Sequence, residues 1–273
     1  MTEFLDHPAV QAAVAPLLVA LIAAIALART RFAWLAILAG YATMVALSTG
    51  FSFSPLTVAR KTVLLGLAMP LVGVVADLLP RPTRATARTL ALAAAALSVW
   101  VFLSVLKQRD AWDAIATGGG IASFVAALVA MVLRLRHDGL RGGAAGLGLG
   151  LATGIAGVLS ASIGYLIAGV AIAASAGALL LMQVVLSRKL APGFTGTLPM
   201  GVLTALFASG TLLLAELRWY VLPLLLLVPA AASMPVPERA PWIVRAAILA
   251  AYALVAAAIP ILAAWYAAHG SLS

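Results

Sequence analysis

The sequence predicts an all-α polytopic membrane protein with about ten transmembrane helices. Apolar residues make up 64% of the 273 residues and charged residues only 9%, whereas a soluble domain carries roughly 25% charged residues. Apolar runs of about 18–20 residues recur along the chain, and each is long enough to cross the hydrocarbon core of a bilayer as a helix. A water-soluble surface cannot be built from this composition.

The first half of the chain is predicted to contain five of these helices. The first follows Glu3, Asp6 and His7 instead of a basic segment, and its apolar run of about 20 residues exceeds the roughly 7–15 of a signal-peptide core. We therefore expect a retained helix. Pro70 predicts a kink in the middle of the third helix, and a polar link at 107–113 separates the fourth from the fifth. The five ranges are about 8–28, 32–50, 62–79, 89–106 and 114–133.

The second half is predicted to contain five more helices, of which the first two are rich in glycine. Glycines at every fourth residue of a helix lie on one face, so that a neighbouring backbone can approach closely. We therefore expect the sixth and seventh helices to pack as a tight hairpin. This glycine stripe consists of Gly142, Gly146, Gly150, Gly154, Gly169 and Gly177. The five ranges are about 142–160, 163–186, 200–217, 219–234 and 242–267, with a turn-rich link at 191–199 before the eighth helix.

The distribution of basic residues predicts the orientation in the membrane. Cytoplasmic loops carry an excess of Lys and Arg, and with the N-terminus outside, 12 of the 17 basic residues fall on the odd-numbered, cytoplasmic loops. We therefore expect an integral protein of the bacterial inner membrane with both termini non-cytoplasmic, and we interpret the net charge of +9 as a topology signal rather than a nucleic-acid-binding surface. The 12 residues are Arg29, Arg31, Arg81, Arg84, Arg88, Arg134, Arg136, Arg141, Arg188, Lys189, Arg239 and Arg245.

Ten helices divide naturally into two halves of five, residues 1–141 and 142–273. An odd number of spans per half inverts the second half relative to the first, and transporters built in this way bind their substrate between the repeats. The segments 50–55 and 193–199 both begin Gly-Phe-Ser/Thr and contain a nearby proline, and they occupy equivalent places in the two halves. The similarity favours a transporter, although Gly, Ser, Thr and Pro are also the residues of ordinary turns.

Polar residues within or beside the predicted helices are the candidate substrate-binding residues. Asp77 could couple a proton or cation, or it could pair with Arg81 one helical turn away. Arg60 and Lys61 could receive an anionic solute or lipid head group, or simply extend to the membrane interface. Gln183 could contact substrate or form an interhelical hydrogen bond. The candidate set is Ser52, Ser54, Arg60, Lys61, Asp77, Gln183 and Thr195.

The sequence gives no support for an enzyme, a cofactor or a metal site. It contains no cysteine, and its three histidines lie in the termini or in a loop, so that thiolate chemistry and histidine ligands within the membrane are excluded. The Gly-x-Gly run at 146–150 lies inside an apolar span with no preceding strand, so it is not a nucleotide-binding loop.

Three hypotheses follow for the function. The first is a secondary-transporter-like permease for a small solute or lipid-like molecule. The second is a non-catalytic membrane subunit or assembly scaffold whose glycine stripe docks a helix of another subunit. The third is a lipid-modifying enzyme with its site at residues 51–61. The expected partners are membrane lipids and, depending on the hypothesis, a small-molecule substrate or other membrane subunits, but not nucleic acid.

Overall fold

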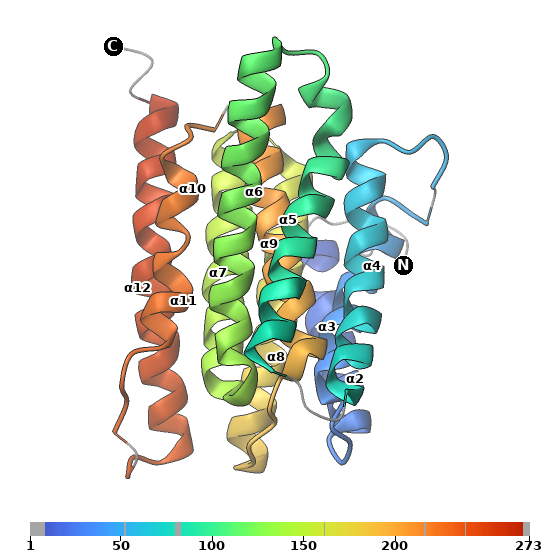
Figure 1. Ribbon diagram of the computed structural model, residues 1–273. Coiled ribbons are helices and arrows are strands. Elements are labelled where there is room, and N and C mark those ends of the chain that lie inside the picture. The colour runs from blue at the N-terminus through green and yellow to red at the C-terminus, as the bar shows by residue number, and fades with distance from the viewer. Residues whose placement is uncertain are drawn as a thin grey trace.

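The fold is entirely helical in the part of the chain that the structure describes, which confirms the predicted all-α class. The computed structural model describes residues 9–51, 53–79, 83–160, 162–215, 217–237 and 239–269, with every side chain in these ranges except that of Gln11. The long helices run roughly side by side in one bundle (Figure 1). Apolar helices of this kind indicate an integral membrane protein.

Seven helices among the described residues are long and apolar enough to cross a membrane. They are α4 (Val58–Leu78), α5 (Arg84–Leu106), α6 (Ala111–Arg134), α7 (Gly139–Leu159), α8 (Ile163–Leu186), α9 (Gly193–Leu214) and α12 (Trp242–His269). They correspond to the third to eighth and the tenth predicted spans. Pro70 lies inside a continuous α4.

Three shorter apolar segments of 10–17 residues lie where the first, second and ninth spans are predicted. At 1.5 Å per residue such segments are about 15–26 Å long, less than the roughly 30 Å of a bilayer core. By length and composition the structure therefore supports seven spans and gives no support for the predicted ten. The short elements are η1 (Val10–Val14), α2 (Ala15–Leu27), η2 (Ala33–Leu35), α3 (Ala36–Ser48), α10 (Val221–Leu224) and α11 (Leu227–Ala232), with η3 (Leu135–His137) between α6 and α7.

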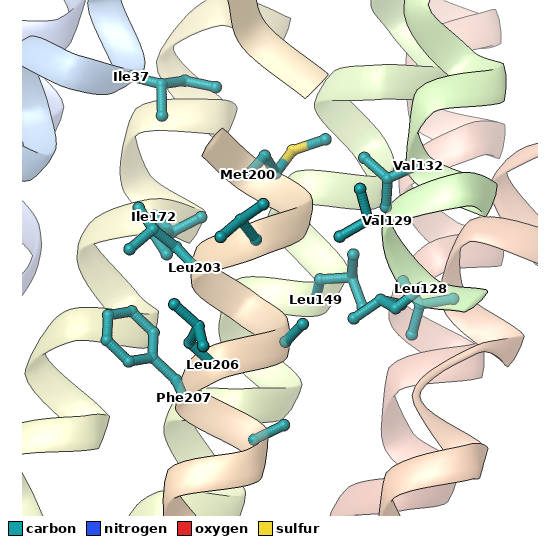
Figure 2. Packing of buried hydrophobic residues seen from close by; sticks show 14 of the residues in the cluster. Ile37, Leu128, Val129, Val132, Leu149, Ile172, Met200, Leu203, Leu206 and Phe207 are labelled. Carbon is teal, nitrogen blue, oxygen red and sulfur yellow. The ribbon is translucent and has the colours of Figure 1, made fainter. Parts of the chain in front are cut away.

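Helix α9 is the centre of the bundle. It packs against α4, α6, α7 and α8, and 83% of its most apolar segment is buried, compared with 39% for α4 and 33% for α12. In Figure 1 it lies between α12 at one side and α4 at the other. Figure 2 shows its side chains among those of α3, α6, α7 and α8. The labelled residues are Met200, Leu203, Leu206 and Phe207 of α9, with Ile37, Leu128, Val129, Val132, Leu149 and Ile172 around them.

The glycine stripe lies inside the chain, mainly between α7 and α8. A Cβ atom at Gly150 would lie 2.6 Å from both the backbone N of Ala173 and the carbonyl O of Gly169. One at Gly146 would lie 2.7 Å from Ala176, also on α8. At such distances only glycine lets the two backbones touch. The face of α7 that carries the stripe is therefore already occupied by the chain itself.

The predicted link at 191–199 is wrong, because α9 begins at Gly193. Gly, Thr and Pro at these positions are typical of a turn, but Phe194, Thr195 and Thr197 are buried within the first turns of a helix. Pro199 is also inside α9. The residues around α9 that make this helical start favourable come from distant parts of the chain.

The links that carry most basic residues meet at one end of the bundle, which we call the basic end. Arg188, after α8, donates a hydrogen bond to the carbonyl O of Ala28, after α2, at 3.5 Å. Arg141, at the start of α7, donates to the carbonyl O of Met234, after α11, at 2.7 Å. These contacts hold several links of one side together, in agreement with the common side that the charge distribution predicts for them. The side of the membrane that this end faces stays a prediction.

The division into two inverted halves also stays a prediction, and the helix packing gives it no support. Helices α4 and α9, at equivalent places in the two halves, do pack against each other. However, α7 packs extensively against α12, whereas the equivalent pair, α2 and α6, shows no comparable packing within the described residues.

Candidate functional site

The start of α9 is held by a carboxylate from another helix. Asp77, at the end of α4, accepts hydrogen bonds from the backbone N of Phe194 and of Thr195, both at 2.8 Å, and from the Thr195 hydroxyl at 2.7 Å. The first N–H groups of a helix have no partner within it, and the helix dipole places partial positive charge there. Pro192, the residue before α9, offers no side-chain cap. Asp77 therefore caps α9 from a distance of more than a hundred residues in sequence.

Two glycines allow this close contact. Gly193 has φ +60°, and a Cβ atom there would overlap the Asp77 carboxylate. Gly73 lies one helical turn before Asp77 on α4, and a Cβ atom there would lie 2.7 Å from the Cα of Thr195. The backbone of α4 at Gly73 and the carboxylate of Asp77 thus both contact the start of α9 at the basic end. We call this contact, formed by Gly73, Asp77, Gly193, Phe194 and Thr195, the α4–α9 clamp.

Asp77 and Thr195 are the two candidate residues that the structure brings together. The alternative partner considered for Asp77, Arg81, lies outside the described residues. A different arginine lies nearby: the guanidinium of Arg136 stands 5.0 Å from the ring centre of Phe194. The clamp is therefore a packing and capping contact in which the carboxylate has three donors.

Gln183 supports the link that leads into α9. Its amide O accepts from the backbone N of Leu190 at 3.4 Å, and its amide N donates to the carbonyl O of Leu179 at 3.2 Å. The indole N–H of Trp34 donates to the carbonyl O of Leu190 at 2.8 Å in a buried hydrogen bond. Both polar groups of Leu190 are thus satisfied by side chains, so this link can lie among the helices.

Ser54, Arg60 and Lys61 lie at the opposite end of the bundle. Arg60 donates to the carbonyl O of Pro55 at 2.9 Å. Lys61 donates to the carbonyl O of Trp100 at 3.2 Å, and its ammonium lies 4.8 Å from the centre of the Trp100 ring. These contacts are those of basic side chains that extend along a helix surface to the interface. Ser54 is exposed, and Ser52 lies outside the described residues.

A large, partly open cavity of about 820 Å³ lies at this opposite end, among α3, α4, α8 and α9. Its mouth is formed where α3 and α9 end, where α4 begins and where α7 is linked to α8. Its polar groups are hydroxyls, and none of the lining residues is Lys, Arg, Asp, Glu or His. The lining hydroxyls belong to Tyr41, Ser48, Thr49, Thr62, Ser160, Ser162 and Tyr165.

Most of these serine and threonine hydroxyls donate to their own helix. Ser48 donates to the carbonyl O of Met44 at 2.7 Å, and Thr62 to that of Val58 at 3.0 Å. A hydroxyl that donates in this way keeps its lone pairs. The cavity wall therefore offers mainly hydrogen-bond acceptors on an apolar background.

Three aromatic rings form the inner part of the cavity. The ring centre of Phe207, on α9, lies 6.5 Å from that of Tyr41 and 6.1 Å from that of Tyr165. Tyr41 is only 1% exposed, and neither tyrosine hydroxyl has a hydrogen-bond partner among the described residues. Gly66 and Gly210 give these rings space, since a Cβ atom at either would overlap a tyrosine ring.

Sequence reasoning missed this cavity. Its residues come from the ends of four helices, and tyrosine and phenylalanine are unremarkable within apolar spans. The only sequence signal is a glycine on the helix that faces each tyrosine, Gly66 for Tyr41 and Gly210 for Tyr165. These pairs cannot be recognised until the positions of the helices are known. Within the described residues, no group of three or more His, Asp or Glu side chains could hold a metal ion.

Comparisons with protein-family models, with curated protein sequences and with solved structures found no match.

Proposed function

We propose that the protein is a permease of the bacterial inner membrane for small, uncharged, largely apolar molecules, with its basic end in the cytoplasm. The observation that carries this proposal is the cavity of about 820 Å³, which lies in the range of roughly 300–1,000 Å³ typical of small-molecule sites. The cavity opens at one end of the bundle, while the α4–α9 clamp lies at the other end.

The cavity reaches only part of the way through the bundle. From Ala215 at its mouth to Phe207 at its inner end, α9 advances by about 12 Å of its roughly 33 Å. Beyond Phe207 the space around α9 is filled by Met200, Leu203 and their neighbours (Figure 2). Passage would therefore need α9 or α4 to move, and the clamp is the contact that would have to open. This is the geometry of a one-side-open state in alternating access.

The lining favours an uncharged substrate. A charge moved into an apolar site without a partner loses its hydration at a cost that rises steeply as the dielectric constant falls. No side chain of the cavity could pair with such a charge. Hydroxyl lone pairs and aromatic faces instead suit a molecule with a few donor groups on an apolar body.

The other two hypotheses have less support. The scaffold hypothesis needs the glycine stripe to be free for a partner helix, but Gly150 already contacts α8 backbone. A lipid-modifying enzyme needs converging reactive groups, whereas Arg60 and Lys61 contact backbone carbonyls.

The absence of cysteine in the natural chain makes accessibility of single cysteines a direct test. Ile167→Cys, inside the cavity, is expected to react with a membrane-impermeant maleimide in vesicles of either orientation, and faster from the cavity side. The reason is that a permease exposes its cavity to each side in turn. The rate of labelling in right-side-out and inverted vesicles measures this.

Two further variants serve as controls. Thr49→Cys, at the mouth, is expected to react from the cavity side only, and Ser209→Cys, fully buried on α9, from neither side. If Ile167→Cys reacted from one side only, while remaining reactive in detergent, the permease proposal would be wrong.

A further inference from the structure

A second, much smaller cavity of about 60 Å³ lies at the basic end. It is formed where α7 begins, where the link after α8 passes and where α12 begins. Its polar and aromatic lining residues are His137, Asp138, Gln183, Lys189, Trp242 and Arg245. None of these lines the large cavity, so this site is separate from the one proposed for transport.

The only acidic side chain in this lining is already engaged. The Asp138 carboxylate accepts from the Nε of Arg141 at 3.1 Å and from the backbone N of Leu140 and of Arg141 at 3.1 and 3.2 Å. It is therefore the N-cap of α7 and the partner of an arginine outside the cavity. It does not neutralise Lys189 or Arg245, neither of which forms an ion pair with any described residue.

Arg245 has an unsatisfied donor. Its Nε is buried and has no hydrogen-bond partner among the described residues, and its guanidinium lies 5.6 Å from the centre of the Trp242 ring. Buried N–H groups in folded proteins nearly always have a partner, and an unpaired one on a cation is especially costly. Together with the exposed Lys189, it gives this cavity two positive charges that have no acidic partner among the described residues.

The size of this cavity and the residues around it indicate which kind of anion it would bind. The cavity exceeds the roughly 10–15 Å³ needed for one water molecule several times over, so a group the size of phosphate has room. Val185, just before the link, and Ile243, beside Trp242, are 78% and 64% exposed. Exposed apolar side chains next to a tryptophan and two cations are typical of the membrane interface. Basic recesses between helices at this level bind the head groups of anionic lipids.

We propose that this cavity binds a phosphate group through Arg245 and Lys189, and that the phosphate belongs to an anionic phospholipid whose acyl chains lie on the exposed apolar surface of α8 and α12. The site is independent of the permease proposal, because it lies at the other end of the bundle and shares no residue with the large cavity.

Native mass spectrometry of the purified full-length chain can test the site, with phosphatidylglycerol and phosphatidylcholine of identical acyl chains as probes. The natural chain is expected to bind phosphatidylglycerol more tightly. In the Lys189→Gln/Arg245→Gln variant the preference is expected to fall roughly 10- to 30-fold, since each basic residue near anionic lipid contributes about a factor of five. Arg245→Lys is expected to keep part of the preference, because it keeps the charge.

The matched control is Arg88→Gln/Arg134→Gln, which removes two exposed basic residues from the same end of the bundle and is expected to keep the full preference.

A second arm measures the thermal unfolding midpoint in inorganic phosphate and in chloride of equal ionic strength. A rise in phosphate alone, with no lipid preference, would assign the site to free phosphate and refute the lipid source. Equal binding of both lipids together with no effect of phosphate, or an equal loss in the control variant, would refute the site itself.

Discussion

Replacing Asp77 by alanine is expected to lower the free energy of unfolding by about 2–4 kcal/mol, because three donors at the start of α9 lose their acceptor at once. Two of them are backbone N–H groups that no other group of the helix can satisfy. Asp77→Asn keeps one acceptor oxygen and loses the charge, so a smaller loss is expected. Thr195→Val removes one of the three hydrogen bonds and is expected to cost about 1 kcal/mol.

These changes can be measured as shifts of the unfolding transition in mixed micelles with increasing denaturing detergent. Asp113→Asn is the matched control, since Asp113 is a carboxylate paired with Arg109 at 3.0 Å on an exposed surface, where such a pair contributes at most about 1 kcal/mol. A loss for Asp77→Ala no larger than that of the control would show that the clamp does not stabilise α9.

Gly150→Leu is expected to prevent the chain from folding. Even the first carbon of the new side chain would lie 2.6 Å from two backbone atoms of α8, and backbone cannot move aside as the end of a flexible side chain can. Overpacking of this kind costs typically 1–3 kcal/mol in a core that can adjust, and more is expected where two helices touch along their backbones. Gly150→Ala adds only the Cβ atom, but this atom already meets the backbone of α8, so a loss at the upper end of this range is expected.

Expression level and the elution profile in size-exclusion chromatography report the outcome. Gly164→Ala is the control, because a Cβ atom at Gly164 would meet no atom within 4 Å, and alanine favours the helix over glycine by about 0.5–1 kcal/mol. The same comparison separates the hypotheses about the stripe. If Gly150→Leu gave a folded, monodisperse protein that had only lost other subunits, the stripe would be a docking surface rather than an internal contact.

Much of the helix order follows from composition alone. Apolar runs bounded by basic or proline-rich links predict the seven long helices nearly in place, because the chain must satisfy its backbone within each span. The stripe of Gly146 and Gly150 was also visible, since the period of a helix places these residues on one face. The apolar runs could not show how much of each run forms one continuous helix. The ninth predicted span, which contains Pro223 and Pro229, forms two short helices, α10 and α11.

The clamp and the cavity were beyond the sequence for a different reason. Asp77 is separated from Thr195 by 118 residues. The sequence around either residue gives no sign that the two are in contact. The start of α9 looked like a turn because its cap is supplied from outside, so the usual signal of a capping residue is missing. Tyr41 and Phe207 likewise form one cavity only after α3 and α9 are placed side by side.

The distance along the chain between Asp77 and its partners also sets an order of events during synthesis. At elongation rates of about 5–20 residues per second, the ribosome reaches Phe194 on the order of 10 s after it has made Asp77. During that interval α5 to α8 are synthesised, and the Asp77 carboxylate is without the donors that later satisfy it. Helix α9 must then enter among the helices made before it, and α10 to α12 follow it along the chain, so the centre of the bundle forms only once α9 has arrived. A chain truncated before residue 193 is therefore expected to be recognised as unfinished by the quality-control proteases of the membrane.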